Sequence, residues 1–293
     1  MSTPLSAKIS SPAPSTPSLG EVRALVAADL QALDECIVAS LRSEVALVDQ
    51  VARYIVAGGG KRLRPLLVLL AARACGHRGE RHVEAAAIVE FIHTATLLHD
   101  DVVDGSDLRR GRDTANAVFG NEASVLVGDF LYSRAFQMMV TIGEMRVMAT
   151  MADATNVIAE GEVLQLMNCN DPDTDEARYF EVIRSKTAKL FEAGARVAAI
   201  LAGAGPGAEE ALARYGAQLG TAFQLVDDAL DYSGSAEDMG KNMGDDLAEG
   251  KPTLPLIQAM RVGSPAQRET IRRAIEHGGL EDLPAIRDAI EWT

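Results

Sequence analysis

The chain has 293 residues, of which 47% are hydrophobic, 24% charged and 4% aromatic, and its formal net charge is −14. The length and apolar content suffice for a large buried core. The acidic balance argues against a nucleic-acid partner, because a nucleic-acid binder needs a basic face to neutralise phosphates.

No segment of the sequence resembles a membrane span or a targeting peptide. The longest apolar run, residues 65–72, is much shorter than the ~18 residues that a bilayer-spanning helix needs. Residues 1–20 are rich in Ser, Pro and Thr and lack an apolar segment, so we expect a disordered tail there. The three cysteines form no CxxC pair, which indicates neither zinc nor disulfides. We therefore expect a soluble protein of the reducing cytoplasm, without a membrane anchor.

From residue 21 onward, the spacing of apolar residues is typical of helices. One helix is predicted over residues 22–33, and a second is expected to end near Ala57, before three glycines. A new helix can begin at Pro65, because the N–H that proline lacks would be unpaired at that position anyway. No repeat or linker divides the chain, so we predict one all-α domain over residues 21–293. Further helices are predicted over residues 81–104, 114–141, 144–168, 175–203, 208–233, 252–262 and 265–277.

One acidic pattern, Asp-Asp-x-x-Asp, occurs twice, at residues 100–104 and 227–231, each time at the end of an apolar helix. The first and last aspartates of each motif share a helix face. Carboxylates clustered near a helix C-terminus repel one another and the helix dipole, and a bound cation removes both penalties. Oxygen ligands suit hard ions such as Mg²⁺, and they could also serve Mn²⁺. The predicted metal ligands are Asp100, Asp104, Asp227 and Asp231, flanked by Asp101 and Asp228.

Two other patterns do not meet the requirements of a metal site. Glu90 and His93 form a Glu-x-x-His pair, but a di-iron bundle needs two such motifs. The stretch that begins at Asp171 starts like an EF-hand loop but lacks the required Gly and Glu at its sixth and twelfth positions. His93 lies two helical turns before Asp100, so it could serve the acidic site or be an ordinary core histidine.

Basic residues alternate with the two acidic motifs along the chain. The segment Gly-Gly-Gly-Lys-Arg-Leu-Arg-Pro at 58–65 places three cations at a helix start, where unpaired backbone N–H groups favour anions. It does not have the Walker A spacing. Any one of these side chains could be an ordinary solvated residue, but their order suits two polyanions, one bound through metal ions and one held by direct contacts. The polar side chains in question are Lys61, Arg64, Arg109, Arg110, Lys186, Thr187, Gln224, Lys241 and Lys251.

In this order the motifs resemble those of the trans-polyprenyl diphosphate synthases, over nearly all of residues 20–293. Residues 91–104, 161–167 and 250–256 are most similar to bacterial members that make long chains. The resemblance implies a helical bundle of the isoprenoid synthase type with a central cavity, Mg²⁺ as cofactor (Mn²⁺ possible), and a homodimer. It implies that an allylic diphosphate such as farnesyl diphosphate condenses with successive isopentenyl diphosphates. The implied product is octaprenyl diphosphate for the side chain of a quinone such as ubiquinone.

The resemblance also implies a role for each matching residue. The six aspartates and Lys186 would form the catalytic group. The allylic diphosphate would be held by Arg109, Lys186, Thr187, Gln224, Lys241 and Lys251. Isopentenyl diphosphate would be held by Lys61, Arg64, His93 and Arg110. Product length would depend on Ala95 and Thr96, one turn before Asp100, and on a deeper floor at Met138 and Met139.

Several alternatives remain open at the level of the sequence. Ala95 and Thr96 are not aromatic, which favours a long product over the C15 or C20 product of a short-chain synthase; a tyrosine at position 95 is expected to shorten the product. Both acidic motifs are intact, which disfavours a non-catalytic partner subunit of a heteromeric synthase. An acidic scaffold that only binds cations would release no diphosphate. The C-terminus at Thr293 is expected to be shorter than the family norm.

Overall fold

The computed structural model describes residues 16–109, 111–233 and 243–291, which are almost entirely helical. The first part of the chain forms α1 (Leu19–Ala24), α2 (Ala27–Ser40), α3 (Ala46–Ala57), α4 (Leu63–Ala74), α5 (Arg81–Val103), α6 (Ala115–Phe119) and α7 (Asn121–Ile142). The middle of the chain forms α8 (Met145–Asn168), α9 (Glu176–Ile183), the π-helical turn η1 (Arg184–Ala188), α10 (Lys189–Leu201) and α11 (Pro206–Ser233). The last helices are α13 (Asp245–Ala248), α14 (Leu254–Val262), α15 (Pro265–His277) and α16 (Leu283–Glu291). Within the described ranges, the only strands are β1 (Leu108–Arg109) and β2 (Arg112–Asp113), which pair antiparallel.

The helix boundaries differ from the sequence prediction where the backbone changes conformation. The helix predicted over residues 114–141 is divided into α6 and α7 at Gly120, whose φ of 89° is incompatible with a continuous helix. The helix predicted over 175–203 contains η1, where the turn widens. Helix α1 begins at Leu19, inside the segment predicted as a tail, at a capping box formed by Ser18 and Glu21. Residues 1–15 of that segment lie outside the described part of the chain.

The main core surrounds α5, which packs against α2, α4, α7 and α10. Three consecutive alanines, residues 85–87, are all buried, so neighbouring helices approach α5 from several sides. Phe91 and Ile92 are fully buried further along the same helix, and each such side chain contributes about 1.5–3 kcal/mol of burial free energy. This packing gives the C-terminal end of α5, which carries the first acidic motif, a rigid base.

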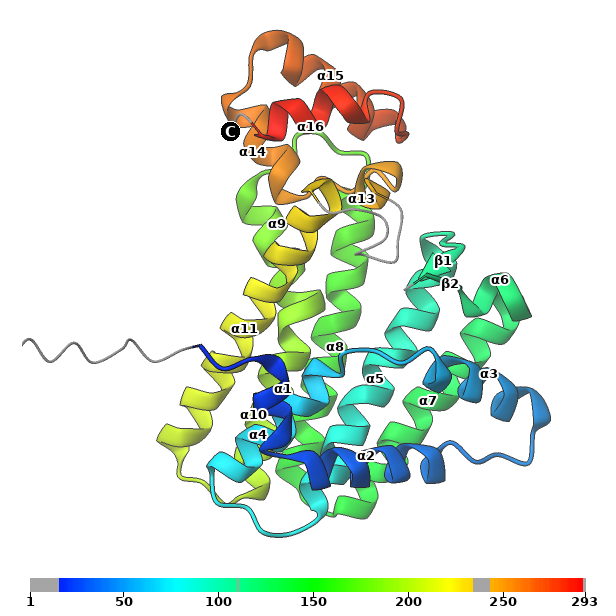
Figure 1. Ribbon diagram of the computed structural model, residues 1–293, viewed down its shortest axis with the longest axis vertical. Helices are drawn as coiled ribbons and strands as arrows, with labels where there is room; N and C mark the ends of the chain where they lie inside the picture. Colours follow the sequence, from blue (N-terminus) through cyan, green and yellow to red (C-terminus); the bar gives the residue numbers. More distant parts are fainter. Residues whose placement is uncertain (1–15, 110, 234–242, 292–293) are drawn as a thin grey trace, which may run out of the picture.

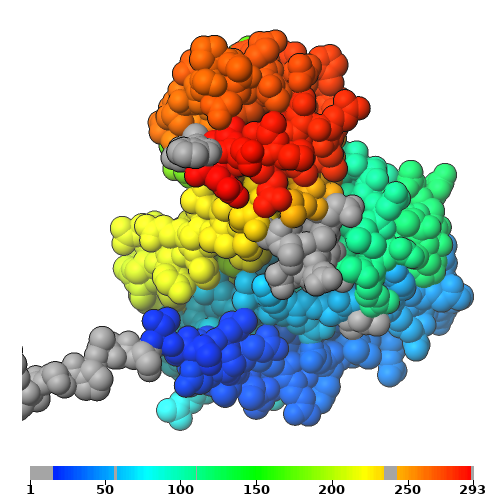
Figure 2. All heavy atoms as spheres, turned by 45° about the horizontal axis from the view of Figure 1, so that its top comes forward, coloured from blue at the N-terminus to red at the C-terminus, as the bar shows by residue number. Residues whose placement is uncertain are grey.

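The last three helices form a smaller unit with its own core, which includes Leu256, Ile271 and Ile286. Figure 1 shows α14, α15 and α16 stacked beyond the ends of α9 and α11, and the space-filling view in Figure 2 shows the same cap on the main body. The C-terminal ends of α5 and α11 both point toward this end of the bundle (Figure 1). Among the described helices, none combines the length and the apolar character that crossing a membrane requires.

Candidate active site

The first acidic motif lies at the C-terminal end of α5, and basic side chains from other segments contact each of its aspartates. Lys186 Nζ lies 3.4 Å from Asp100 Oδ2, and Lys251 Nζ lies 2.8 Å from Asp104 Oδ2. Arg109 of β1 contacts Asp101, with its Nε 2.7 Å from Oδ1. Three parts of the chain that are distant in sequence, namely α5 with β1, η1 and the loop at Lys251, therefore meet at one cluster of carboxylates.

Two further carboxylates, which the sequence analysis did not single out, belong to this cluster. Glu162 of α8 lies 2.5 Å from Lys186 Nζ, and Glu249 lies 2.5 Å from Lys251 Nζ. Burial, helped by the nearby Asp100, raises the pKa of Glu162 to about 7, although Lys186 acts in the opposite direction. Burial also raises the pKa of Glu249. Both pKa values are raised first by burial and then by the neighbouring carboxylates, against the opposing effect of the lysines.

The second acidic motif lies at the end of α11, and its middle carboxylate is fully enclosed. The Tyr179 hydroxyl donates to Asp228 Oδ2 at 2.5 Å, and Gln224 Nε2 donates to Asp228 Oδ1 at 2.7 Å. Burial, together with the negative charge of Asp228, raises the pKa of Tyr179. Asp231 is also buried and accepts a hydrogen bond from the backbone N–H of Asp246 at 3.2 Å.

The turn η1 connects the two acidic motifs. Its residue Lys186 contacts Asp100, whereas the next residue, Thr187, donates a 2.9 Å hydrogen bond to Gln224, which binds Asp228. A π-type turn is wider than an α-helical turn and is frequent at functional sites. Here it directs consecutive side chains toward opposite acidic clusters.

Two glycines allow the neighbouring helices to come close to η1. A Cβ at Gly161 of α8 would lie 2.8 Å from the backbone N of Lys186, and a Cβ at Gly220 of α11 would lie 2.7 Å from Ala188 Cα. Real Cβ atoms do not approach other atoms this closely, so only glycine fits at these positions. The position of Lys186 between the two acidic motifs therefore depends on these glycines.

A second segment, residues 244–251, also reaches both acidic motifs. The backbone of Asp246 binds Asp231, and Lys251 binds Asp104. Burial alone would lower the pKa of Lys251, but the carboxylates of Asp104 and Glu249 outweigh it and raise the pKa. The two motifs thus share two bridging segments, which is the arrangement needed for one ligand to contact both.

The loop before α4 and the first turn of α4 carry the other group of basic residues. Arg64 Nη1 lies 3.1 Å from His93 Nε2, and because a guanidinium can only donate, His93 accepts here. Arg64 also stacks on the ring of Phe191 at 4.6 Å. Lys61 is exposed, and its carbonyl accepts a hydrogen bond from Arg23 of α1 at 3.1 Å. Arg64 and His93, which are distant in sequence, therefore contact each other, and Lys61 lies three residues before Arg64 in the chain.

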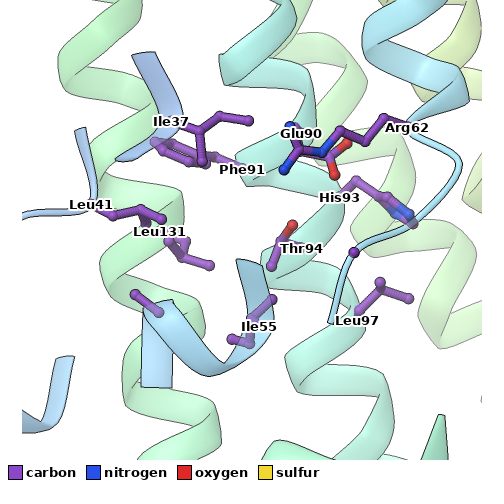
Figure 3. Close-up of a pocket in the computed structure, with 12 residues that line it drawn as sticks. Ile37, Leu41, Ile55, Arg62, Glu90, Phe91, His93, Thr94, Leu97 and Leu131 are labelled. Carbon is purple, nitrogen blue, oxygen red and sulfur yellow. The ribbon is translucent and has the colours of Figure 1, made fainter. Parts of the chain in front are cut away.

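A cavity of about 50 Å³ lies behind this loop, next to His93, Arg62 and Glu90. Figure 3 shows Arg62 extending toward Glu90, with His93 and Leu97 on the same side of α5. Arg62 has a left-handed backbone, with a φ of 45°, and pairs with Asp34 of α2. The cavity is too small for a diphosphate and separates the loop from the apolar core.

The oxygen-only donors of the two motifs fit Mg²⁺ better than softer metals. In the described ranges, no group of three or more His, Cys, Asp or Glu side chains could hold a metal ion by itself. In proteins, Mg²⁺ is commonly held by one or two carboxylates together with substrate phosphates. The ammonium groups of Lys186 and Lys251 bind Asp100 and Asp104 respectively, which shows that these carboxylates attract positive charge.

The sequence model of the polyprenyl synthetase family matches residues 45–292. The chain belongs to this family. Its sequence is 57% identical over 283 residues to octaprenyl diphosphate synthase of Escherichia coli (strain K12), covering 94% of this chain and 88% of the relative. It is 50% identical to the geranyl-diphosphate-specific all-trans-nonaprenyl-diphosphate synthase of Rhodobacter capsulatus, covering 91% of this chain and 82% of the relative.

The fold agrees with solved structures of the same family. A crystal structure of polyprenyl synthase from Caulobacter crescentus CB15, complexed with calcium and isoprenyl diphosphate, superposes with a TM-score of 0.91 at 47% identity, covering 94% of this chain and 84% of that chain. The all-α isoprenoid synthase fold, the family resemblance and the long-chain prenyltransferase assignment made from sequence are thereby confirmed.

The structure brings most of the predicted site residues of this family member together. All six aspartates, with Arg109, Lys186, Thr187, Gln224 and Lys251, lie in the two linked acidic clusters or contact them. Two predicted residues, Arg110 and Lys241, lie outside the described part of the chain. Glu162, Glu249 and Tyr179 were not predicted from the sequence: the partners of Glu162 and Tyr179 lie on other elements and leave no local pattern, and Glu249 belongs to none of the motifs.

A larger open cavity, of about 800 Å³, lies beside the first acidic motif between α5, α7 and α8. Asp100 and Glu162 border it, as do Tyr132 and Phe136 of α7. His99 of α5 lies 3.5 Å from Asp129 on α7, and Phe136 is seven residues further along α7, or ~10.5 Å at 1.5 Å per residue. The cavity therefore extends about two helical turns away from the acidic cluster.

The four residues predicted to set product length occupy different environments. Thr96 lines the larger cavity. Ala95 and Met139 are buried in the main core, and Met138 packs against that core. The cavity wall is instead aromatic at Tyr132 and Phe136, whose ring centroids lie 6.0 Å apart. These aromatic residues are candidates for the product-length role that the sequence analysis gave to the two methionines.

Proposed function

We propose that this enzyme condenses an allylic diphosphate with successive molecules of isopentenyl diphosphate, in a Mg²⁺-dependent reaction, to form all-trans octaprenyl diphosphate. The observation that supports this proposal most is that η1 and residues 244–251 each join the two acidic motifs, beside a cavity of about 800 Å³. The names of the relatives support the chemistry, and octaprenyl is the product named for a relative with 57% identity. The family generally depends on Mg²⁺.

The two diphosphates would bind to different groups of residues. The allylic diphosphate would lie between the acidic motifs, near Arg109, Lys186 and Lys251. Isopentenyl diphosphate would lie near Lys61, Arg64 and His93. These side chains would contact its diphosphate directly, without a metal ion. A relative crystallised with calcium and isoprenyl diphosphate supports the pairing of a divalent cation with a diphosphate in this fold.

The mechanism follows from where the charge develops. Breaking the allylic C–O bond leaves the bonding electron pair on a diphosphate oxygen and produces an allylic carbocation. Lys186, Lys251 and Arg109 would stabilise the leaving anion more strongly as the bond breaks than before it breaks. Mg²⁺, when bound, would supply additional neutralisation of the same charge. The alkene of isopentenyl diphosphate then attacks the cation, and a proton passes to the departing diphosphate.

We also propose that the enzyme is a homodimer that associates through the outer face of α7. Leu126 and Val140 are 65% and 68% exposed, and they are 14 residues apart, which places them on the same face of α7. Met145, at the start of α8, is 75% exposed. Exposed apolar side chains grouped along one helix favour burial against a second surface.

The proposed reaction can be tested by incubating the purified protein with farnesyl diphosphate, radiolabelled isopentenyl diphosphate and Mg²⁺, with and without EDTA. We expect a labelled product of about eight isoprene units, and its loss when EDTA removes the metal. A labelled product of only four units, one more than the farnesyl starter, would identify a short-chain synthase. Binding of Mg²⁺ without any product would indicate a non-catalytic subunit or a cation-binding scaffold.

A further inference from the structure

The second aspartate of the second motif is held by the protein on both of its oxygens. Asp228 is 3% exposed, and its Oδ2 and Oδ1 accept hydrogen bonds from Tyr179 and Gln224 respectively. Both donors are neutral, and burying a carboxylate is costly even when it is hydrogen-bonded. An apolar residue could be buried at this position at a lower free-energy cost. The buried carboxylate therefore indicates that the orientation of this residue is required.

Asp228 differs from its neighbours in direction. Successive helical residues are about 100° apart around the axis, so the side chains of Asp227 and Asp231 share a face that Asp228 does not. The direction of Asp228 is toward α9, where Tyr179 is 4% exposed. Fixing Asp228 therefore fixes the rotation of the end of α11, and with it the direction of Asp227.

Helix α9 is a firm support for this contact. Asp175 caps its N-terminus by accepting a hydrogen bond from the backbone N–H of Arg178. The Arg178 side chain then binds Asp171 at 2.7 Å and Asn168, the last residue of α8, at 2.5 Å. Tyr179 thus extends from a helix that is tied to the end of α8, which also carries Glu162 of the first cluster.

We propose that Tyr179 is a positioning residue, which sets the orientation of the second acidic motif relative to the first through the hydrogen-bonded series Tyr179–Asp228–Gln224–Thr187. Thr187 is covalently next to Lys186, which contacts Asp100, so the series connects both motifs. This inference rests on the proposed function, because the expected effect of Tyr179 is on the binding of the allylic diphosphate. Tyr179 itself is assigned no contact with substrate.

The test is Tyr179→Phe, which removes one hydroxyl and keeps the ring. We expect kcat/KM for the allylic diphosphate to fall about tenfold, because a hydrogen bond to a charged group contributes on that order. The KM for isopentenyl diphosphate should stay within about twofold, because its proposed site is elsewhere. By calorimetry, pyrophosphate binding in the presence of Mg²⁺ should weaken to a similar degree, which gives a readout independent of turnover. In a double-mutant cycle, Tyr179→Phe should add little to Asp228→Asn.

A matched control is Tyr232→Phe. Tyr232 is equally buried and follows Asp231 directly, but its hydroxyl faces Thr253, and within the described residues no hydrogen bond joins it to an aspartate of the second motif. We expect this variant to keep both KM values and the calorimetric affinity. If Tyr179→Phe behaves like the control, or raises the two KM values equally, the inference is overturned while the proposed function stands. If the wild-type protein shows no Mg²⁺-dependent pyrophosphate binding and no product, the proposed function is overturned together with the inference.

Discussion

At the scale of single residues, the active site is a balance of buried charges. At the first motif, Asp100 and Asp104 lie near Glu162 of α8, and Lys186 and Lys251 are their counter-ions. The sequence predicts the aspartates and the lysines, because they belong to recognisable motifs. It does not predict Glu162 or Tyr179, because their roles depend on burial and on partners that only the folded chain brings together.

The raised pKa of Glu162, about 7 against an ordinary value of 4.5, predicts a pH dependence of stability. The folded state holds this proton more tightly than the unfolded state, so the stabilising contribution is present below about pH 4.5 and is lost as the pH rises toward about 7. We therefore expect Glu162→Gln to melt at a higher temperature than wild type near pH 8, and at a similar temperature near pH 5. Thermal unfolding without ligand measures both.

Glu160→Gln is the control for this pH dependence, since Glu160 lies on the same helix but is exposed. It should leave the melting temperature unchanged at either pH. A lower melting temperature of Glu162→Gln near pH 8 would mean that the ion pair with Lys186 outweighs the cost of burying the carboxylate and its repulsion from Asp100.

At the scale of elements, the segments that depart from a regular α-helix position several residues of the candidate site. The periodicity of residues 175–203 predicts a helix, and the structure has one, but an apolar pattern cannot reveal that five residues form the π-type turn η1. That turn depends on the close approach of α8 and α11, which is a property of the packed bundle. The hairpin that holds Arg109 was missed for a similar reason: its two-residue strands are too short to show alternation.

The closeness of α8 and η1 predicts the effect of Gly161→Ala. The new Cβ would lie 2.8 Å from a backbone nitrogen that cannot move without shifting Lys186. We expect a loss of about 1–3 kcal/mol in the free energy of unfolding, typical of overpacking, and a large fall in turnover. Gly207→Ala, at a helical position with nothing within 4 Å, should be neutral or slightly stabilising. Urea denaturation compares the two, and equal stabilities would show that α8 can move away at no cost.

The larger cavity predicts how product length responds to its wall. Thr96→Tyr would place a ring one turn from Asp100 and is expected to shorten the product, whereas Phe136→Ala should lengthen it by removing an aromatic wall. The buried position of Ala95 changes the earlier expectation for this site, since Ala95→Tyr would overpack the core as well as obstruct the cavity. Reversed-phase chromatography of dephosphorylated products measures the lengths. Unchanged products from both cavity variants would place the growing chain elsewhere.

At the scale of the whole molecule, composition and periodicity predicted an all-α chain, and the family relationship confirmed it. How the C-terminal helices stack on the ends of α9 and α11 was not predictable, because it depends on the non-local core around Leu256 and Ile271. Nor does the sequence show which apolar side chains remain exposed after folding; the folded chain shows that α7 presents such a face.

The proposed dimer predicts that Leu126→Glu combined with Val140→Glu yields monomers. Two charges on the outer face of α7 would oppose burial against a second subunit. Light scattering coupled to size-exclusion chromatography measures the mass directly. Val262→Glu, at an exposed apolar residue of α14, should leave the mass unchanged. A dimeric mass for the α7 double variant would place the interface on another surface.

The helices at the start of the chain hold the basic loop in place. Arg23 of α1 binds the carbonyl of Lys61, and Asp34 of α2 pairs with Arg62 at the left-handed residue of the loop. Both helices precede residue 45, where the family match begins. A shortened chain that starts at residue 45 would keep every diagnostic motif and still lose the two tethers of the loop that we propose for isopentenyl diphosphate. The bounds of the family model alone would therefore leave out helices that support this loop.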